Sequence, residues 1–145
     1  MSDKPPPRGR SEITRADYQA LSDFRYLLRC FLEFSQTAAR GVGLTPRQHQ
    51  ALLAIKGFPD DSLVTIGDLA ERLRIRHHSA VELVDRLCEA GLVMRRQDEN
   101  DQRRVVLMLT DQANDHLAEL SMAHLDELSR IEPMLSRILA RRKVS

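Results

Sequence analysis

The sequence predicts a mainly α-helical fold with one small antiparallel β-hairpin. Apolar residues recur at spacings of three and four through most of the 145 residues, which is the period of amphipathic helices. Two short runs, LVMRR at 92–96 and VVLML at 105–109, have β-type composition and flank a charged stretch, as the strands of a hairpin do. A chain of this length can fold as one domain around a core.

The overall composition limits the classes of protein to consider. Hydrophobic residues make up 42% of the chain and charged residues 30%, a balance typical of globular proteins rich in amphipathic helices. The formal net charge is only +1, so the chain is not a polycation. Binding to nucleic acid would therefore require positive charge to be concentrated on one face.

No residues are spaced like the ligands of a metal or the groups of a catalytic centre. Cys30 and Cys88 form no CxxC motif, which indicates a reducing compartment and inert packed thiols, although a redox role for Cys30 is an alternative. The histidines are scattered, and the sequence has no glycine-rich phosphate loop and no nucleophile elbow. We therefore expect no metal, no cofactor and no enzymatic activity.

The N-terminus is predicted to be a disordered tail. MSDKPPPRGRS contains no apolar segment of a secretory signal, and its three consecutive prolines favour an extended chain. We expect the tail over residues 1–13, followed by a single domain over 14–145. No apolar run approaches the roughly 20 residues that a membrane span requires, so we expect a cytoplasmic protein with no membrane partner.

The first helix is expected over about 14–40. Thr14, with Asp17 three residues later, forms a capping-box pattern that opens a helix. Gly41 fits the position that follows a helix end, where a left-handed backbone is common. The helix should therefore end near Arg40.

Two further helices begin at threonines that are followed three residues later by a side chain able to complete a capping box. These pairs are Thr45 with Gln48, where a proline also occupies the first helical position, and Thr65 with Asp68. The helix that starts after Thr45 should end near Lys56–Gly57, because a proline follows closely and cannot continue it.

A fourth helix is expected over 77–90, ended by Gly91. Only Arg74–Arg76 separates it from the preceding helix, and two helices joined by such a short turn form a helix-turn-helix. The two β-type runs come next, so the charged stretch at about 97–104 is the loop of a hairpin. A helix-turn-helix followed by a hairpin is a winged helix-turn-helix.

The chain ends in a long helix. Thr110 caps it, and Pro133 breaks or kinks it, so that a last short helix follows. The predicted organisation is a winged helix-turn-helix core over about 45–110, between further helices over about 14–40 and 111–142.

Residues 65–110 resemble the DNA-binding core of the MarR (multiple antibiotic resistance regulator) family of transcription regulators. The matching pieces are GDLAERL, LVDRL, GLV, the pair Asp101 and Arg103, and Leu109-Thr110 at the family's spacing. GLTPRQHQALLAI, residues 43–55, resembles the family's second helix. The resemblance implies a homodimeric, sequence-specific DNA-binding transcription regulator, a ligand-responsive repressor, that reads a pseudo-palindromic operator on double-stranded DNA.

The sequence departs from the family pattern at a few positions. Arg76 stands where a serine or threonine cap is usual, and Gln102 stands where an arginine is common. Ala113 replaces a usual glycine, and the C-terminal helical section is short. The first two departures bear on DNA sequence preference, and the others bear on helix geometry and dimer packing.

The predicted recognition helix, about 77–90, should enter the major groove, where its N-terminal side chains reach base edges. The arginines of the preceding turn should contact phosphates, and a solvated turn is the alternative. Glu82 can accept a hydrogen bond from a cytosine amine, or pair with a neighbouring arginine such as Arg76 or Arg86. The expected DNA-contacting residues of the turn and helix are Arg74, Arg76, His77, His78, Ser79, Glu82 and Arg86.

The predicted wing, about 97–104, carries several arginines. The resemblance implies that Arg103 enters the minor groove, whose negative potential attracts arginine when it is narrow. It also implies that Asp101 braces Arg103 or a nearby arginine, and paired hydrogen bonds to a guanidinium would do this. Arg95, Arg96 and Arg104 flank this pair as phosphate contacts. The alternative is a solvated loop with internal salt bridges.

The charge balance leaves a second function open. Residues 74–104 contain seven arginines and six acidic residues, so this region is not a basic block. A winged-helix protein-interaction module without specific DNA binding is therefore the alternative to a DNA-binding regulator.

The two ends of the chain have more apolar positions than a lone winged helix needs to cover. The expected dimerisation residues are Leu21, Phe24, Leu28, Leu128, Ile131, Leu135 and Ile138. Members of the resembled family often bind small aromatic ligands between the dimer helices and the DNA-binding lobe. The candidate effector-binding residues are Phe31, Phe34, His49 and Phe58, and the alternative is that these side chains belong to the core.

Overall fold

The computed structural model describes residues 12–140, which fall into two compact units. We call residues 35–124 the central unit, and residues 12–34 together with 125–140 the helical unit. The first and the last helix of the chain each contribute to both units.

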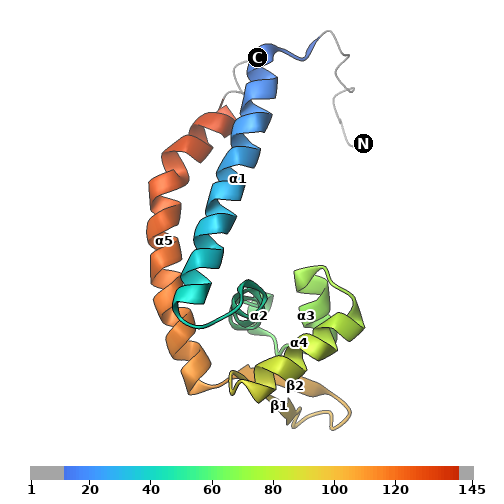
Figure 1. The fold of residues 1–145 in the computed structure, drawn as a ribbon. Helices are drawn as coiled ribbons and strands as arrows, with labels where there is room; N and C mark the ends of the chain where they lie inside the picture. Colours follow the sequence, from blue (N-terminus) through green and yellow to red (C-terminus); the bar gives the residue numbers. More distant parts are fainter. Residues whose placement is uncertain (1–11, 141–145) are drawn as a thin grey trace, which may run out of the picture. The chain divides into compact units, whose positions relative to one another are not determined.

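The described residues form five α-helices, one short 3₁₀ helix and one β-hairpin (Figure 1). In chain order these elements are α1 (Arg15–Gly41), α2 (Pro46–Lys56), η2 (Pro59–Asp61), α3 (Ile66–Leu73), α4 (His77–Glu89), β1 (Val93–Gln97), β2 (Val105–Leu109) and α5 (Asp111–Ala140). This order confirms the predicted class, a mainly α-helical winged helix-turn-helix.

The core of the central unit is apolar and draws on nearly every element of that unit. Burying a leucine side chain fully stabilises a fold by about 1.5–3 kcal/mol. The largest fully buried side chains are Leu52 of α2, Leu69 of α3, Val84 and Leu87 of α4, Val106 of β2 and Leu120 of α5. Since α3, α4 and β2 share this core, the helix-turn-helix and the hairpin are held in one arrangement.

The predicted capping boxes start α2 and α3. The Thr45 hydroxyl accepts from the backbone N–H of Gln48 at 3.1 Å, and the Gln48 side chain accepts from the Thr45 N–H at 3.0 Å. Thr65 and Asp68 make the same two bonds at 3.1 and 3.0 Å. The starts of these two helices could therefore be predicted from residue types alone, because the two residues of each capping box lie three positions apart.

The end of α1 differs from the prediction. Gly41 is the last residue of the helix, and Gly43, two residues later, takes the left-handed conformation with φ +82°. The Leu44 N–H donates to the Ala39 carbonyl at 2.9 Å, which closes a Schellman motif. Leu44 is only 5% exposed, so burying this side chain favours the later end. As predicted, α4 ends just before Gly91, and this glycine adopts φ +73°.

The hairpin pairs β1 with β2 in an antiparallel register from Val93 opposite Leu109 to Gln97 opposite Val105. A third segment joins it, because the Leu107 N–H donates to the Val64 carbonyl at 2.7 Å. The sequence did not predict this bridge, since a single residue carries no alternating pattern.

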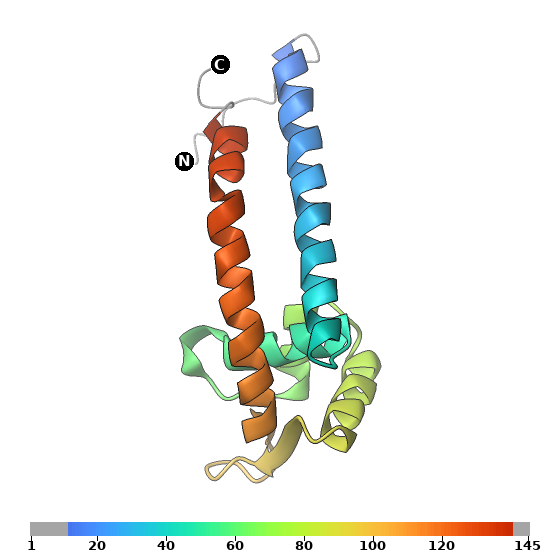
Figure 2. The ribbon, with the colours of Figure 1, turned by 60° about the vertical axis from the view of Figure 1, so that its left-hand side comes forward.

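The helical unit consists of the N-terminal part of α1 and the C-terminal part of α5, which run along each other (Figures 1 and 2). Thr14 and Asp17 form the predicted capping box. The prediction that Pro133 separates two helices is wrong, because α5 continues through it to Ala140. Proline removes one N–H donor, but its φ near −65° is helical, so turns on both sides can sustain the helix.

None of the helices among residues 12–140 is long and apolar enough to cross a membrane. The predicted tail at 1–13 lies outside the described residues, except for its last two positions.

Candidate nucleic-acid interface

The turn between α3 and α4 is closed by a strained arginine. Arg74 adopts the left-handed conformation, with φ 57° and ψ 45°, at a position that usually selects glycine. The Ile75 N–H donates to the Ala70 carbonyl at 3.0 Å, which completes a Schellman motif. The Arg74 guanidinium bonds to Glu71 at 2.8 Å, but both side chains are more than three-quarters exposed, so this pair adds little stability. Arg74 therefore lies on the surface as predicted, already beside an acid.

The start of α4 is exposed and lacks a side-chain cap. Arg76 occupies the N-cap position, and no side chain bonds to the first backbone N–H groups there. His77 and His78 are exposed, whereas Ser79 is half-buried. The first turn of a helix carries unpaired N–H donors and partial positive charge, so this end is suited to an anion such as a DNA phosphate.

One side of α4 faces a small hollow shared with the first turn of α2. The hollow has a volume of about 190 Å³ and is lined by Arg47, Ile75, Ser79, Glu82, Leu83 and Arg86. Within residues 12–140, Glu82 pairs with neither Arg76 nor Arg86, so the predicted alternative pairing is not seen. Arg47 was not among the predicted contact residues. Its position in the first turn of the helix before the helix-turn-helix was the only available signal.

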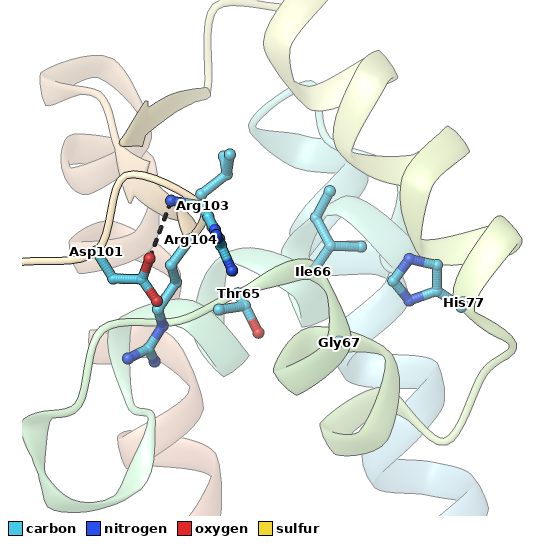
Figure 3. A pocket seen from close by; sticks show the side chains of 8 residues that line it. Thr65, Ile66, Gly67, His77, Asp101, Arg103 and Arg104 are labelled. Carbon is cyan, nitrogen blue, oxygen red and sulfur yellow. Dashed lines mark hydrogen bonds between the residues drawn. The ribbon is translucent and has the colours of Figure 1, made fainter. Parts of the chain in front are cut away.

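The wing (residues 97–104) is folded by short-range bonds from two aspartates. The Asp98 carboxylate accepts from the Asn100 N–H at 3.1 Å, and the Asp101 carboxylate accepts from the Arg103 N–H at 3.0 Å (Figure 3). The Arg104 N–H donates to the Asp101 carbonyl at 2.9 Å. Asp101 therefore orders the backbone that carries the wing arginines, and bonds to no guanidinium among the described residues.

Arg103 and Arg104 are neighbours with different surroundings. The Arg104 guanidinium donates to the Leu63 carbonyl at 3.1 Å and lies 3.9 Å from Asp98 and 4.0 Å from Asp68. Arg103 is exposed, and its guanidinium makes no ion pair within residues 12–140. Arg104 thus links the wing to the segment before α3, whereas the exposed Arg103 guanidinium can bind an anion without breaking an ion pair among the described residues.

The two arginines of β1 also differ. Arg95 pairs with Asp85 of α4, and its guanidinium also contacts the Cys88 sulfur at 3.5 Å. Arg96 is exposed and has no ion pair in the part of the chain that the structure describes. Arg95 therefore ties the hairpin to α4 and neutralises one of the acids on that helix, whereas Arg96 remains open to a phosphate.

An open hollow of about 600 Å³ lies between the wing and the start of the helix-turn-helix. It is lined by Thr65, Ile66, Gly67, His77, Asp101, Arg103, Arg104 and Val105. Figure 3 shows the wing residues on one side and His77 on the other, with the start of α3 between them. The structure thus brings together two predicted contact groups, the start of α4 and the wing, on one face.

The candidate effector residues lie in separate surroundings. Phe31 and Phe34 belong to the helical unit and are half-buried. In the central unit, Phe58 lines a hollow of about 250 Å³ between the end of α2 and β2, whereas His49 lies elsewhere, under α5. Asn114 also lines the Phe58 hollow, and its buried side-chain oxygen accepts no hydrogen bond among the described residues.

His49 is a buried core histidine, 4% exposed, that packs against His124 with ring centroids 4.9 Å apart. The Nδ1 of His124 bonds to the Leu120 carbonyl, and its Nε2 lies 2.8 Å from the Ser35 hydroxyl. Burial lowers the pKa of His49, and the nearby His124 lowers it further. This side chain is therefore neutral at pH 7.

The helical unit presents an unusual amount of apolar surface. Four predicted dimerisation residues are exposed, and Leu21 is 64% exposed. Ile131, by contrast, is buried within the single chain, and Leu135 and Ile138 are half-buried. Further exposed apolar residues, which were not among the predicted dimerisation residues, are Tyr18, Tyr26, Leu32, Leu125, Met134 and Leu139.

Comparison with known proteins places this architecture among transcription regulators. The model of the MarR family matches residues 42–104. Over 111 residues the chain is 33% identical to the uncharacterized HTH-type transcriptional regulator YcgE of Bacillus subtilis (strain 168), and the match covers 77% of this chain and 68% of YcgE.

Solved structures show the same fold at lower identity. A MarR family protein from Bacillus stearothermophilus is 20% identical with a TM-score of 0.72, over 91% of this chain and 95% of that one. A variant of S. aureus MepR, bound to an oligodeoxyribonucleotide, is 19% identical with a TM-score of 0.64, over 89% of this chain and 98% of that one.

Proposed function

Because the chain belongs to the MarR family of transcription regulators, we propose that it is a homodimeric, sequence-specific DNA-binding regulator and a ligand-responsive repressor. In this proposal, α4 enters the major groove and the wing enters the adjacent minor groove of double-stranded DNA. The expected operator is pseudo-palindromic, with half-sites roughly one helical turn, about 10 base pairs, apart.

One observation carries this proposal. The start of α4 and the exposed Arg103 flank the same open hollow. A DNA backbone strand lies between a major and a minor groove, so a protein that reads both grooves needs such an arrangement. Phosphates seated there would meet His77 and the uncapped start of α4, while Arg103 would extend into the narrow groove.

The ion pairs of the central unit leave several arginines of the proposed interface unpaired. Asp85, one of three acids on α4, is already paired with Arg95. Arg76, Arg96 and Arg103 have no ion pair among the described residues. Each ion pair removes a positive and a negative charge together, so pairing does not raise the net charge. The three unpaired arginines nevertheless lie at the start of α4, on β1 and on the wing, and a second protomer would double their number along one DNA molecule.

The apolar surface of the helical unit supports a homodimer. Soluble chains rarely leave many large apolar side chains uncovered on adjoining helices, and such surfaces mark interfaces. We propose that Leu21, Phe24, Leu28 and Leu128 contact a second protomer, and that the buried Ile131 supports this surface from beneath. Leu135 and Ile138 would contribute their exposed edges.

The hollow that Phe58 lines is the proposed site of ligand response. Of the four candidate residues, Phe58 has the most suitable surroundings. It lines a hollow that also contains the Asn114 amide oxygen, which accepts no hydrogen bond among the described residues. Small-molecule sites commonly combine apolar walls with a few polar groups. We propose Phe58 as an effector contact, and Phe31, Phe34 and His49 as packing residues.

The experiment that tests the proposed function is selection of DNA from a random pool with the purified full-length chain. We expect enrichment of a two-fold symmetric sequence whose half-sites are separated by about one helical turn. Affinity for the selected duplex should fall with salt by roughly 0.9 log unit per phosphate contact for each tenfold rise in concentration.

The opposite outcome would favour the protein-interaction module. Glu82 and Glu89 on the exposed side of α4 motivate that alternative, because they repel phosphates. If no sequence is enriched and binding to DNA is weak at low salt, the regulator proposal is refuted.

A further inference from the structure

Three charged side chains line the small hollow beside α4. Arg47, Glu82 and Arg86 all line it, yet none forms an ion pair within residues 12–140. Some other charged residues of this region are paired within the chain, Asp85 with Arg95 and Arg74 with Glu71.

Glu82 lies on an outward side of the helix that the proposed function places in the major groove. It is exposed, whereas Leu83 and Val84 beside it face the core. A carboxylate in a DNA groove is repelled by phosphates unless it meets a hydrogen-bond donor. Carboxylates accept hydrogen bonds only, and the amino group of cytosine is the donor for which they are the usual protein partner in that groove.

Arg47 and Arg86 lie close enough to Glu82 to offset the repulsion between its carboxylate and the DNA phosphates. Ser79, Glu82 and Arg86 share one side of α4 through spacings of three and four, and Arg47 approaches the same hollow from the first turn of α2. Arginine donates up to five N–H groups in a fixed fork that suits phosphate. Phosphates on either side of a cytosine read by Glu82 would therefore meet Arg47 and Arg86.

We propose that Glu82 reads the amino group of a cytosine in each half-site, and that Arg47 of α2 is a phosphate contact beside it. This proposal rests on the proposed function, because it requires α4 to enter the major groove. It adds a base identity to the operator, a C·G pair, and a DNA contact outside the recognition helix and the wing.

The test of Glu82 compares two duplexes in a binding titration followed by fluorescence anisotropy. The first is the selected operator, and in the second the C·G pair of each half-site is replaced by T·A. Thymine presents an acceptor where cytosine presents a donor, so the native chain should bind the second duplex about five- to a hundredfold more weakly. Glu82→Gln should bind both within about twofold, since an amide both donates and accepts.

The matched control is Glu89→Gln, which removes the same charge near the other end of α4. It should keep the native preference for C·G, because the residue lies outside the hollow. If Glu82→Gln keeps the native preference too, or if no position of the half-site requires C·G, the assignment of Glu82 is overturned, while operator binding itself stands. Enrichment of no operator would instead refute the proposed function.

Arg47 has its own test. Arg47→Ala should weaken binding to both duplexes by the same factor, and should reduce the slope of log affinity against log salt by about one per protomer. Lys56→Ala, at the opposite end of α2, removes a charge of the same sign and should leave the slope unchanged. Equal slopes for Arg47→Ala and the native chain would overturn the phosphate contact. Circular dichroism of each variant checks that it is folded.

Discussion

Two adjacent arginines of the wing, Arg103 and Arg104, illustrate how neighbouring residues of one type acquire different roles. The Arg104 guanidinium donates to the Leu63 carbonyl and lies close to the carboxylates of Asp68 and Asp98. Among the described residues, the Arg103 guanidinium has no ion pair, and its backbone N–H donates to the Asp101 carboxylate. A guanidinium that is positioned but unpaired loses no internal partner when it binds DNA, which favours Arg103 as the minor-groove residue.

Arg103→Ala should therefore weaken binding to the selected operator by about 1–3 kcal/mol without lowering the free energy of unfolding. A binding titration and a urea unfolding series measure the two quantities. Arg104→Ala is the comparison, and it should lower stability because it releases the wing from Leu63. Binding by Arg103→Ala equal to that of the native chain would remove this residue from the interface.

For Asp101, the sequence predicted a place in the wing but not the bonding partner of its carboxylate. Its type and spacing predicted a role in the wing, and the structure places it there. Its bonding partner, however, depends on the backbone path of the loop, which residue types do not specify. An aspartate two residues before an N–H can close a local turn, and this competes with the expected bond to a guanidinium.

At the scale of elements, the start of α4 combines a weak cap with a proposed binding role. Arg76→Ser supplies a hydroxyl that can accept a bond from the first turn, so it should raise the free energy of unfolding by about 0.5–2 kcal/mol. The same change removes a proposed phosphate contact and should reduce operator affinity and its salt slope. Arg76→Ala should reduce affinity without stabilising the helix. A variant Arg76→Ser that binds as tightly as the native chain would exclude a phosphate contact.

The elements also show why some boundaries were predictable and others were not. Capping boxes and the glycine after α4 depend on residues three to five positions apart, so the sequence contains the whole interaction. The end of α1 depends on burial of Leu44, and α5 continues through Pro133, so both outcomes depend on packing. The Val64–Leu107 bridge joins residues far apart in the chain, which no local pattern encodes.

At the scale of the whole molecule, the buried His49 should make stability depend on pH. Its pKa in the folded state lies below the usual value of about 6.5, so the unfolded chain binds the proton more readily. The stability from keeping His49 neutral is present above that value and is lost as the pH falls toward the folded pKa, by up to about 1.4 kcal/mol per pH unit. Urea unfolding between pH 7.5 and 5.5 measures the slope.

His49→Leu is the control for this dependence. It removes the titrating group while keeping a side chain of similar volume, so its unfolding free energy should fall less steeply with acid. Identical slopes for the variant and the native chain would assign the pH dependence to other groups.

The assembly of two chains should govern DNA affinity. Leu21→Asp combined with Leu128→Asp places charges on the exposed apolar surface of the helical unit, where they should prevent dimerisation. Sedimentation should then show a monomer, and affinity for the full operator should approach that for a half-site. Leu53→Asp, an exposed leucine of α2 in the central unit, is the matched control. A dimer that survives the double change would exclude this surface as the interface.

The hydrogen bond from the Leu107 N–H to the Val64 carbonyl should limit local opening of the hairpin. An isolated two-stranded hairpin is marginally stable in water, so its amides would normally exchange with solvent through frequent local fraying. Here the middle of β2 is also tied to the segment that precedes α3, and Leu107 is 3% exposed. The Leu107 amide proton should therefore exchange with deuterium at the rate of cooperative unfolding of the central unit, whereas the amides of the wing loop exchange quickly.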